Sequence, residues 1–318
     1  MAELVDAKDS KSFDRKVMRV RFSPAALVQK VIAIVGPTAS GKSSLGIYLA
    51  KKLKGEVISA DSRQVYRGME IISRAPNKQD KASVPHHLVG IANPKKQYSA
   101  GTYAQEAERV IAALASKHKI PIVVGGAGFY TDALLREKRP PEVPPNKKLR
   151  ATLAKKTPAQ LLALLKKIDP ASATRVDQRN IVRLVRAIEI AQALGKVPAL
   201  KTQSSYEILW LGLLPTKKIH ASAIQKGIEE RLAAGMVREV KQLRARLTKK
   251  RFTELGFEFE LLAAYLDKEM SKKELAEKLA QGEQRYAIRQ MRWFKRNPDI
   301  HWVHNKSEAA KLSKTFLS

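Results

Sequence analysis

The sequence of 318 residues contains no cysteine. Disulfide bonds, thiolate nucleophiles and cysteine-ligated zinc are therefore excluded, and the absence fits a reducing compartment. No apolar run approaches the ~20 residues that a membrane-spanning helix needs, and residues 1–30 have no apolar stretch of the kind found in secretory signals. From these absences we expect a cytoplasmic protein that does not enter a membrane.

Acidic residues are also scarce, since 30 Asp and Glu stand against 60 Lys and Arg. The resulting net charge of +30 and pI of about 10.2 indicate a polyanionic partner. The basic residues are spread along the whole chain, so a general charge bias of the source proteome is the alternative explanation. Apolar residues make up 44% of the sequence, which is enough to build a core.

The strongest local pattern is GPTASGKS at residues 36–43, which follows an apolar run at 31–35 and precedes an amphipathic segment at 44–54. Strand, glycine loop and helix in this order are typical of a P-loop. Glycines let several backbone N–H groups point at one phosphate chain, Lys42 adds a cation, and the Ser43 hydroxyl suits Mg²⁺. We therefore predict a diphosphate or triphosphate site formed by Gly36, Pro37, Thr38, Ala39, Ser40, Gly41, Lys42, Ser43 and Ser44.

A second buried strand is expected at residues 56–60, and Asp61 follows it directly. The carboxyl ends of neighbouring parallel strands meet at one edge of an α/β sheet, where ligands bind. Asp61 is thus placed to act as a catalytic base. Its position alone leaves two other roles open, as N-cap of the following turn or as outer-shell ligand of Mg²⁺.

A second glycine turn, GGAG at residues 125–128, follows an expected strand at 120–124. It should lie at the same sheet edge as the P-loop, and the two turns could line one pocket. Close packing of strand against helix is the simpler explanation of its glycines. The segment at 67–94 is expected to be loop-rich, and its adjacent histidines, His86 and His87, are given structural roles rather than a metal site.

Four prolines mark a connector at residues 136–145, after which residues 146–194 have helical periodicity. A strand-like run returns at 206–214, so the helical block is predicted to be a small domain inserted into the sheet domain. The expected division is a disordered tail at 1–29, a core at 30–138 and 200–318 that ends in helices, and the insertion at 139–199. The predicted fold class is α/β, with a P-loop NTPase-like parallel sheet.

Basic residues mark two of the predicted helices. In the insertion, Arg179, Arg183 and Arg186 recur at a spacing that shares one helix face, which suits a phosphate backbone unless it is simply solvated. Apolar residues of the same helix are expected to face inward, namely Ile181, Leu184, Val185 and Ile188. The last long helix, expected at 271–296, interleaves basic with aromatic residues. That mixture is typical of RNA binding, and equally of an amphipathic helix with buried aromatic residues.

Seven motifs, in their order and spacing, resemble the tRNA dimethylallyltransferase family, also called the IPP transferase family. The resemblance covers residues 31–303. The motifs are GPTASGKSSL at 36–45, ISADSRQVYRGMEI at 58–71, PHHL at 85–88, YSAGTY at 98–103, VVGGAGFY at 123–130, RLVRAIEI at 183–190 and RQMRWFKR at 289–296.

This resemblance implies transfer of a dimethylallyl group from dimethylallyl diphosphate to N6 of the adenosine 3′ of the anticodon, in tRNAs that read codons beginning with U. Asp61 would be the base, Lys42 and Ser43 would act on the departing diphosphate with Mg²⁺, and Lys226 would add a diphosphate contact. The implied partners are a tRNA anticodon stem-loop, whose adenine must leave its stack, and dimethylallyl diphosphate. We expect a monomer. The implied tRNA contacts are Asp61, Ser62, Arg63, Gln64, Ala127, Arg150, Val182, Arg183, Leu184, Val185 and Arg186.

The sequence departs from the family pattern near the implied diphosphate site. Ala127 stands where threonine is usual, two expected arginines fall on Ala223 and Gly227, and ISRAP at residues 72–76 replaces part of the usual IGTAKP. Two alternative functions follow from these residues. One is a small-molecule P-loop kinase, and the other is a tRNA-binding homologue with weakened catalysis.

Overall fold

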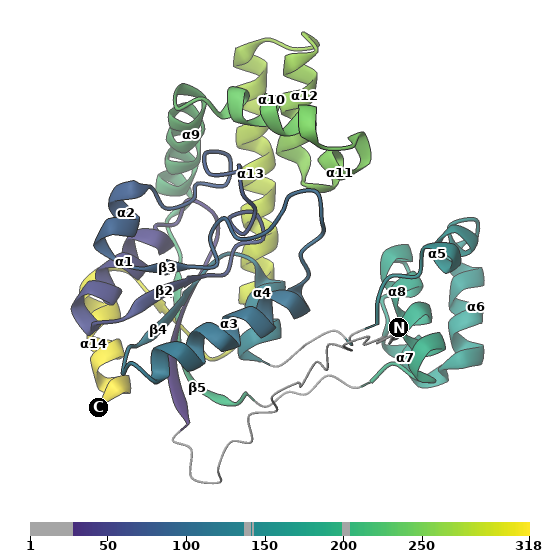
Figure 1. Cartoon of the computed structure of the whole chain (residues 1–318), viewed down its shortest axis with the longest axis horizontal. Helices are drawn as coiled ribbons and strands as arrows, with labels where there is room; N and C mark the ends of the chain where they lie inside the picture. The colour runs from purple at the N-terminus through teal and green to yellow at the C-terminus, as the bar shows by residue number, and fades with distance from the viewer. Residues whose placement is uncertain (1–27, 137–140, 142, 199–203) are drawn as a thin grey trace, which may run out of the picture.

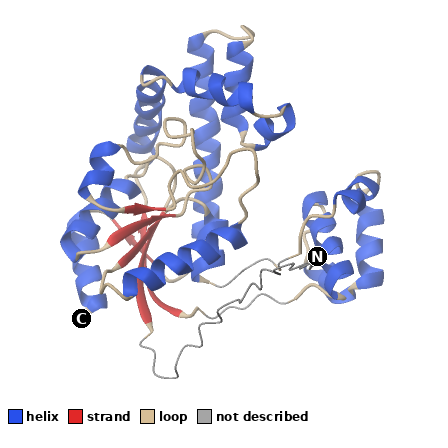
Figure 2. Ribbon diagram, viewed as in Figure 1, coloured by secondary structure: helices blue, strands red, loops and turns tan. Residues whose placement is uncertain are grey.

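The computed structural model describes residues 28–136, 141, 143–198 and 204–318. Its centre is a six-stranded sheet of order β3-β2-β4-β1-β5-β6, in which every neighbouring pair is parallel (Figure 2). The strands are β1 (Gln29–Val35), β2 (Glu56–Ser59), β3 (His86–His87), β4 (Pro121–Val124), β5 (Tyr206–Leu213) and β6 (Ile300–Val303). The predicted α/β fold class is confirmed. The predicted tail at residues 1–29 lies almost wholly outside the described residues.

The central strand β1 is buried on both faces. Its side chains alternate, so that Val31, Ala33 and Val35 join one hydrophobic cluster while Ile32 and Ile34 join the other. All five are fully buried. A parallel strand covered on both faces reads as a continuous apolar run, because neither set of side chains meets water. That is why the sequence shows no polar alternation before the P-loop.

Helices cover both faces of the sheet (Figure 1). On one face α1 and α14 pack over the smaller cluster, and on the other α3, α4 and α9 to α13 build the larger one. The bounds are α1 (Lys42–Leu53), α2 (Lys78–Ser83), α3 (Ala100–Ala115), α4 (Gly128–Leu135), α9 (Lys217–Ala233), α10 (Met236–Arg246), α11 (Lys249–Glu254), α12 (Phe257–Leu266), α13 (Lys272–Phe294) and α14 (Lys306–Leu317). None of the described helices is long and apolar enough to span a membrane.

Five of these elements, β3, β6, α2, α11 and α14, are absent from the sequence prediction. β3 has two residues and exists because His86 and His87 pair with β2. With α2 it interrupts the segment 67–94, most of which consists of turns and loops, as expected. β3, β6, α2 and α11 have between two and six residues each, too few to show a period. Ser99 caps α3, since its hydroxyl accepts a hydrogen bond from the Thr102 N–H at 3.0 Å.

Between α4 and β5 the chain forms a group of four helices with a hydrophobic core of its own, here called the helical cluster (Figure 1). The helices are α5 (Lys147–Leu153), α6 (Pro158–Ile168), α7 (Pro170–Arg175) and α8 (Ile181–Leu194). Leu161 and Leu165 of α6 are fully buried against Leu184 and Ile188 of α8. These helices lie within the segment for which the sequence predicts an inserted domain.

Two expectations about α8 were wrong. The helix begins at Ile181 with Asn180 as its N-cap, so Arg179 lies in the preceding turn and does not share a helix face with Arg183 and Arg186. Ile181 is 46% exposed and does not face inward. The Asn180 side chain accepts a hydrogen bond from the Arg183 N–H, so the helix begins after Arg179, and Ile181 lies in its exposed first turn.

The separate core predicts that Leu165→Ala loosens the helical cluster without loosening the sheet. The side chain is fully buried, and truncation of a buried leucine costs roughly 2–5 kcal/mol. Hydrogen exchange on the full chain should become faster across residues 147–194 and stay unchanged in β1 and β4. Leu211→Ala, equally buried in β5, is the matched control and should give the reverse pattern. Loss of protection in both regions after Leu165→Ala would show that the two cores unfold together.

Candidate functional site

The P-loop joins β1 to α1. Gly36 and Gly41 have φ angles of 142° and 90°, which favour glycine. A Cβ on Gly36 would also lie 2.7 Å from the carbonyl oxygen of Leu213 in β5, so the loop passes too close to the sheet for a side chain. The first turn of α1 contains no acidic residue. Its N–H groups and the positive end of the helix dipole therefore favour an anion at this point.

Lys42 is the cation of this loop. Its ammonium donates a hydrogen bond to the Pro37 carbonyl oxygen. Burial lowers the pKa of Lys42 to about 8, while the Asp61 carboxylate acts to raise it and Arg74 acts to lower it. An ammonium with too little negative charge beside it is stabilised by any anion that binds there.

Asp61 follows β2 and meets the P-loop at the same sheet edge. Its Oδ1 accepts hydrogen bonds from the backbone N–H groups of Arg63 at 2.8 Å and Gln64 at 3.3 Å. The capping role that the sequence left open is therefore present. The turn uses only Oδ1, so Oδ2 is left for a second role in the cavity that Asp61, Lys42 and Ser43 line together.

The second glycine turn lies beside the P-loop because β4 pairs with β1. Gln290 of α13 joins the two turns: its Oε1 accepts from the Thr38 N–H at 2.8 Å, and its Nε2 donates to the Gly126 carbonyl at 2.9 Å. A Cβ on Gly126 would lie 2.2 Å from that Nε2, so glycine is needed for the close approach of the helix. Both expectations for this turn, tight packing and a shared cavity, are confirmed.

Two adjoining cavities open at this edge. The small cavity, about 130 Å³, has charged and polar walls, whereas the aromatic cavity, about 690 Å³, is lined by six rings. The rings belong to Tyr66, Tyr98, Phe129, Tyr130, Tyr286 and Trp293. The cavities share the lining residues Arg63, Gly126, Tyr286 and Gln290. The small cavity therefore suits a compact anion, and the aromatic cavity suits a flat ring that must approach it.

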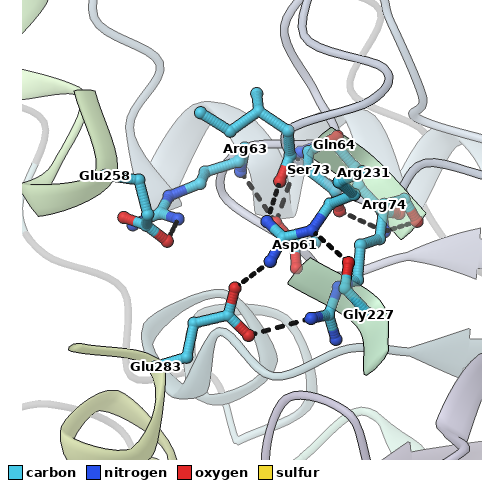
Figure 3. A network of polar contacts seen from close by, with 10 residues as sticks. Asp61, Arg63, Gln64, Ser73, Arg74, Gly227, Arg231, Glu258 and Glu283 are labelled. Carbon is cyan, nitrogen blue, oxygen red and sulfur yellow. Dashed lines mark hydrogen bonds and ion pairs between the residues drawn. The ribbon is translucent and has the colours of Figure 1, made fainter. Parts of the chain in front are cut away.

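Two buried carboxylates hold three arginines at the small cavity (Figure 3). Glu258 of α12 accepts a hydrogen bond from Arg63, and Glu283 of α13 accepts from Arg231 and, at 2.9 Å, from Arg74. Glu258 and Glu283 are 2% and 3% exposed, so neither carboxylate could stay charged there without partners. Because two guanidinium groups share Glu283, positive charge remains in excess beside the P-loop.

Several predicted site residues meet here. Thr38, Ala39, Lys42, Ser43, Asp61, Arg63 and Gln64 line the small cavity, and Ser62, Arg63 and Ala127 line the aromatic cavity. The Gln64 amide is used inside the protein, where it accepts from the Ser59 hydroxyl at 2.8 Å and donates to the carbonyls of Ser73 and Arg74. Gln64 therefore positions the chain at residues 73–74, and its contact with tRNA stays a prediction.

The other predicted tRNA contacts belong to the helical cluster. Val182 is 78% exposed, whereas Leu184 is fully buried and Val185 packs against the same core. A side-chain contact from Leu184 to an external partner is therefore excluded by its place in the core.

Three predicted arginines of the helical cluster keep part of their surface exposed. Arg150 makes two hydrogen bonds of 2.7 Å to the buried Glu189, and Arg186 bonds the same carboxylate at 3.2 Å. Although burial acts to raise it, these hydrogen bonds and one from the Asn146 N–H hold the pKa of Glu189 below its ordinary value. The Arg183 side chain is 55% exposed and lies 3.6 Å from Asp177. A clamp role for the three arginines stays a prediction.

Lys226 lies outside the small cavity. Its side chain is 77% exposed, and its ammonium lies 3.9 Å from the Glu230 carboxylate on the same helix. The structure does not support a diphosphate contact from Lys226. Arg74 and Arg231 instead line the small cavity, and the sequence analysis did not single them out.

Most of the residues missed from sequence lie on helices that come late in the chain. Glu283, Tyr286, Gln290 and Trp293 of α13 recur at intervals of three or four, and each lines one or both cavities. This helical spacing was the available signal, because one polar and aromatic face on an otherwise amphipathic helix is unusual. Nothing in the local sequence marks Arg231, and Arg74 drew notice only as part of the departure from the family pattern at residues 72–76.

Oxygen ligands for a metal are few. In the part of the chain that the structure describes, no group of three or more His, Cys, Asp or Glu could hold a metal ion. His87 pairs with Glu56 at 2.7 Å and His86 contacts the Val84 carbonyl at 2.7 Å, so both have structural contacts. The Ser43 hydroxyl and the Asp61 carboxylate line one cavity. This pair fits Mg²⁺, which keeps several waters and binds chiefly through phosphate oxygens and one or two protein oxygens.

Known proteins are similar to this chain in both sequence and fold. A model of the IPP transferase family matches residues 64–297, and a model named isopentenyl transferase matches residues 29–86. A tRNA dimethylallyltransferase of Pelotomaculum thermopropionicum is 34% identical over 284 residues, which cover 86% of this chain and 90% of that protein. One of Roseiflexus sp. is 36% identical over 282 residues, covering 85% and 91%.

Two solved structures extend the comparison. The full-length tRNA isopentenylpyrophosphate transferase from Bacillus halodurans superposes with a TM-score of 0.68 at 29% identity, covering 91% of this chain and 95% of that one. A eukaryotic dimethylallyltransferase acting on tRNA gives a TM-score of 0.78 at 26% identity, covering 91% and 79%. The IPP transferase model spans the whole helical cluster and the sheet domain between residues 64 and 297, and the isopentenyl transferase model covers β1, the P-loop and β2. The chain therefore belongs to the IPP transferase family.

Proposed function

We propose that this protein transfers a dimethylallyl group from dimethylallyl diphosphate to N6 of the adenosine 3′ of the anticodon, in tRNAs that read codons beginning with U. One observation carries the proposal: a P-loop and a carboxylate share a small polar cavity that adjoins an aromatic cavity. The reaction needs both cavities side by side, a polar one for the anionic leaving group and an aromatic one for the flat nucleophilic base. Relatives named tRNA dimethylallyltransferase support the same assignment.

The diphosphate of the donor would occupy the small cavity. Backbone N–H groups of the P-loop and the Lys42 ammonium supply donors there, and the loop backbone is held by Gln290. The adenine, turned out of the anticodon loop, would enter the aromatic cavity, where the rings of Tyr286 and Trp293 offer stacking surfaces. The two substrates thus meet beside Asp61.

The reaction exchanges one bond for another. The N6 nitrogen forms a bond to C1 of the dimethylallyl group while the bond from C1 to the diphosphate oxygen breaks, and the electron pair leaves with diphosphate. The proton released from N6 passes to Asp61, whose Oδ1 is fixed by the turn at Arg63 and Gln64. The Lys42 ammonium and the loop N–H groups stabilise the charge that collects on the leaving oxygen.

Mg²⁺ is part of this proposal. Ser43, with Asp61 near it, would hold the ion at the small cavity. A bound Mg²⁺ would neutralise charge on the diphosphate.

The helical cluster and the excess of basic residues are assigned to tRNA binding. Arg150, Arg183 and Arg186 would hold the phosphate backbone of the anticodon stem, which accounts for part of the net charge of +30. A cytoplasmic location and a monomeric state also belong to the proposal. A small-molecule kinase is not favoured, because the IPP transferase model matches the helical cluster and α13, and the isopentenyl transferase model matches the P-loop.

Asp61→Asn is the sharpest test of the base. The amide oxygen of asparagine can still accept the two N–H groups of the turn, so the fold is kept while the proton acceptor is lost. Prenyl transfer to an anticodon stem-loop, followed by nucleoside mass spectrometry, should slow by about 10²–10⁴-fold. Asp267→Asn, in an exposed ion pair with Arg244, is the control and should be as active as the parent protein. A fully active Asp61→Asn protein would remove Asp61 from the chemistry.

The low pKa of Lys42 predicts how donor binding depends on pH. Bound diphosphate would raise this pKa from about 8, so binding takes up a proton when the free lysine is neutral. The Kd for dimethylallyl diphosphate should therefore rise above about pH 8, by up to about tenfold per pH unit. Calorimetry in buffers of different ionisation enthalpy would detect the proton. Lys42→Arg stays charged and should lose this dependence; the same rise in that variant would assign it to another group.

Arg183→Ala tests the proposed clamp. Loss of one phosphate contact should reduce the slope of log K against log salt for stem-loop binding by about 0.7–0.9. Fluorescence anisotropy at several salt concentrations gives this slope. Arg244→Ala lies outside both cavities and the helical cluster, so it should leave the slope unchanged. An unchanged slope in Arg183→Ala would place the tRNA elsewhere.

A further inference from the structure

Arg74 lines the small cavity together with Lys42 and Ser43. Its side chain is 27% exposed, and its charge is close enough to Lys42 to help lower the pKa of that lysine. Two cations that repel each other at one small cavity both gain when an anion binds there. Arg74 is therefore a candidate ligand for whatever anion the P-loop binds.

The backbone at Arg74 is held in an uncommon conformation. Its φ is 53°, in the left-handed region that residues other than glycine seldom adopt. Gln64 Nε2 holds this turn by donating to the carbonyls of Ser73 at 3.3 Å and Arg74 at 3.1 Å, and the Arg74 N–H donates to Ile71 at 3.2 Å. Such strain persists where the surroundings fix it, often at ligand sites. Figure 3 shows the Arg74 side chain directed from this turn toward Glu283.

The guanidinium of Arg74 has donors to spare. Its Nη2 bonds to Glu283 at 2.9 Å, while its buried Nε has no hydrogen-bond partner among the described residues. Arg231, the other partner of Glu283, is more fully engaged, with further bonds to the carbonyls of Gly227 at 2.9 Å and Ile72 at 3.0 Å. Of the two arginines that share Glu283, Arg74 has more N–H groups left to donate to a ligand.

Gly227 makes room for this guanidinium. A Cβ at that position would lie 2.6 Å from Nη2 and 2.8 Å from Cζ of Arg74. Glycine inside a helix is otherwise unfavourable relative to alanine, and Gly227 lies within α9. The position where the family pattern has an arginine is thus occupied, in space, by the side chain of Arg74.

We propose that Arg74 binds the diphosphate of the donor substrate and stabilises it as it leaves. This inference rests on the proposed function. When the bond between C1 and the diphosphate oxygen breaks, the electron pair moves to that oxygen, and a guanidinium can meet two phosphate oxygens at once. Arg74 thus supplies the diphosphate-binding cation that was predicted at Lys226. Although Ala223 and Gly227 stand where the family pattern has arginines, the site keeps a guanidinium.

The test uses the full-length chain and Arg74→Gln. Binding of inorganic diphosphate with Mg²⁺ is measured by calorimetry, and prenyl transfer to an anticodon stem-loop is measured in parallel. Arg74→Gln should weaken diphosphate binding by at least about tenfold and lower kcat by about 10²–10³-fold, with unchanged stem-loop affinity. Arg244→Gln, which removes an exposed ion pair outside the cavity, is the matched control and should change none of these.

Two further variants separate binding from folding. Arg74→Lys keeps the charge and the ion pair with Glu283 but loses the planar fork, so it should recover only part of the diphosphate affinity. Gly227→Ala removes no charge and suits a helix, yet its Cβ displaces the guanidinium and should weaken diphosphate binding as well. If circular dichroism shows that Arg74→Gln is unfolded, these two variants decide the question.

The outcomes are distinct. Diphosphate binding and kcat equal to those of the parent protein in a folded Arg74→Gln would overturn the inference, as would parental values in both Arg74→Lys and Gly227→Ala. A parent protein that binds diphosphate through Arg74 but transfers no prenyl group would overturn the proposed function and leave the anion site standing. A parent protein that neither binds diphosphate nor transfers a prenyl group would overturn both.

Discussion

The site depends on one contact, the side-chain amide of Gln290 against two glycine turns. It accepts from Thr38 of the P-loop and donates to Gly126 of the second turn, and both bonds require α13 to approach the sheet edge closely. Glycine at 126 and 128 allows that approach, since Cβ atoms there would overlap Gln290 and Trp293. The same helix face then places Glu283 and Tyr286 in the cavity walls. The packing of α13 against the two glycine turns thus forms the cavities at the sheet edge.

Charge in the small cavity is arranged by carboxylates that do no chemistry themselves. Glu258 and Glu283 are buried, and each is neutralised by arginine. Such pairs add little net stability, because desolvation offsets much of the attraction. Their value lies in orientation: they hold guanidinium groups beside the P-loop lysine without cancelling all of the positive charge. Asp61 is the third carboxylate of the small cavity, and it accepts hydrogen bonds from the backbone N–H groups of Arg63 and Gln64 instead of from an arginine side chain.

In the proposed function, chemistry and tRNA recognition belong to different parts of the chain. The sheet edge with α13 contains the two cavities, while the helical cluster has its own core and its own ion pairs around the buried Glu189. Because the helical cluster has its own core, it can hold its exposed arginines without any change to the cavities at the sheet edge. This division suits a substrate much larger than the group transferred, because a stem-loop must be held along its backbone while one base reaches the reacting carbon.

The sequence by itself determined the P-loop, the strand end at Asp61, the second glycine turn and the helical character of residues 146–194, because each is a local pattern of backbone freedom or apolar period. Only the tertiary structure decided which cations face the small cavity. Arg74, Arg231 and Glu283 lie far apart in sequence, and their pairing depends on helix packing and on the space at Gly227. Lys226 was chosen from sequence because it adjoins Gly227, one of the two positions where the family pattern has an arginine. Closeness in sequence gives no indication of whether a side chain faces the cavity or the solvent.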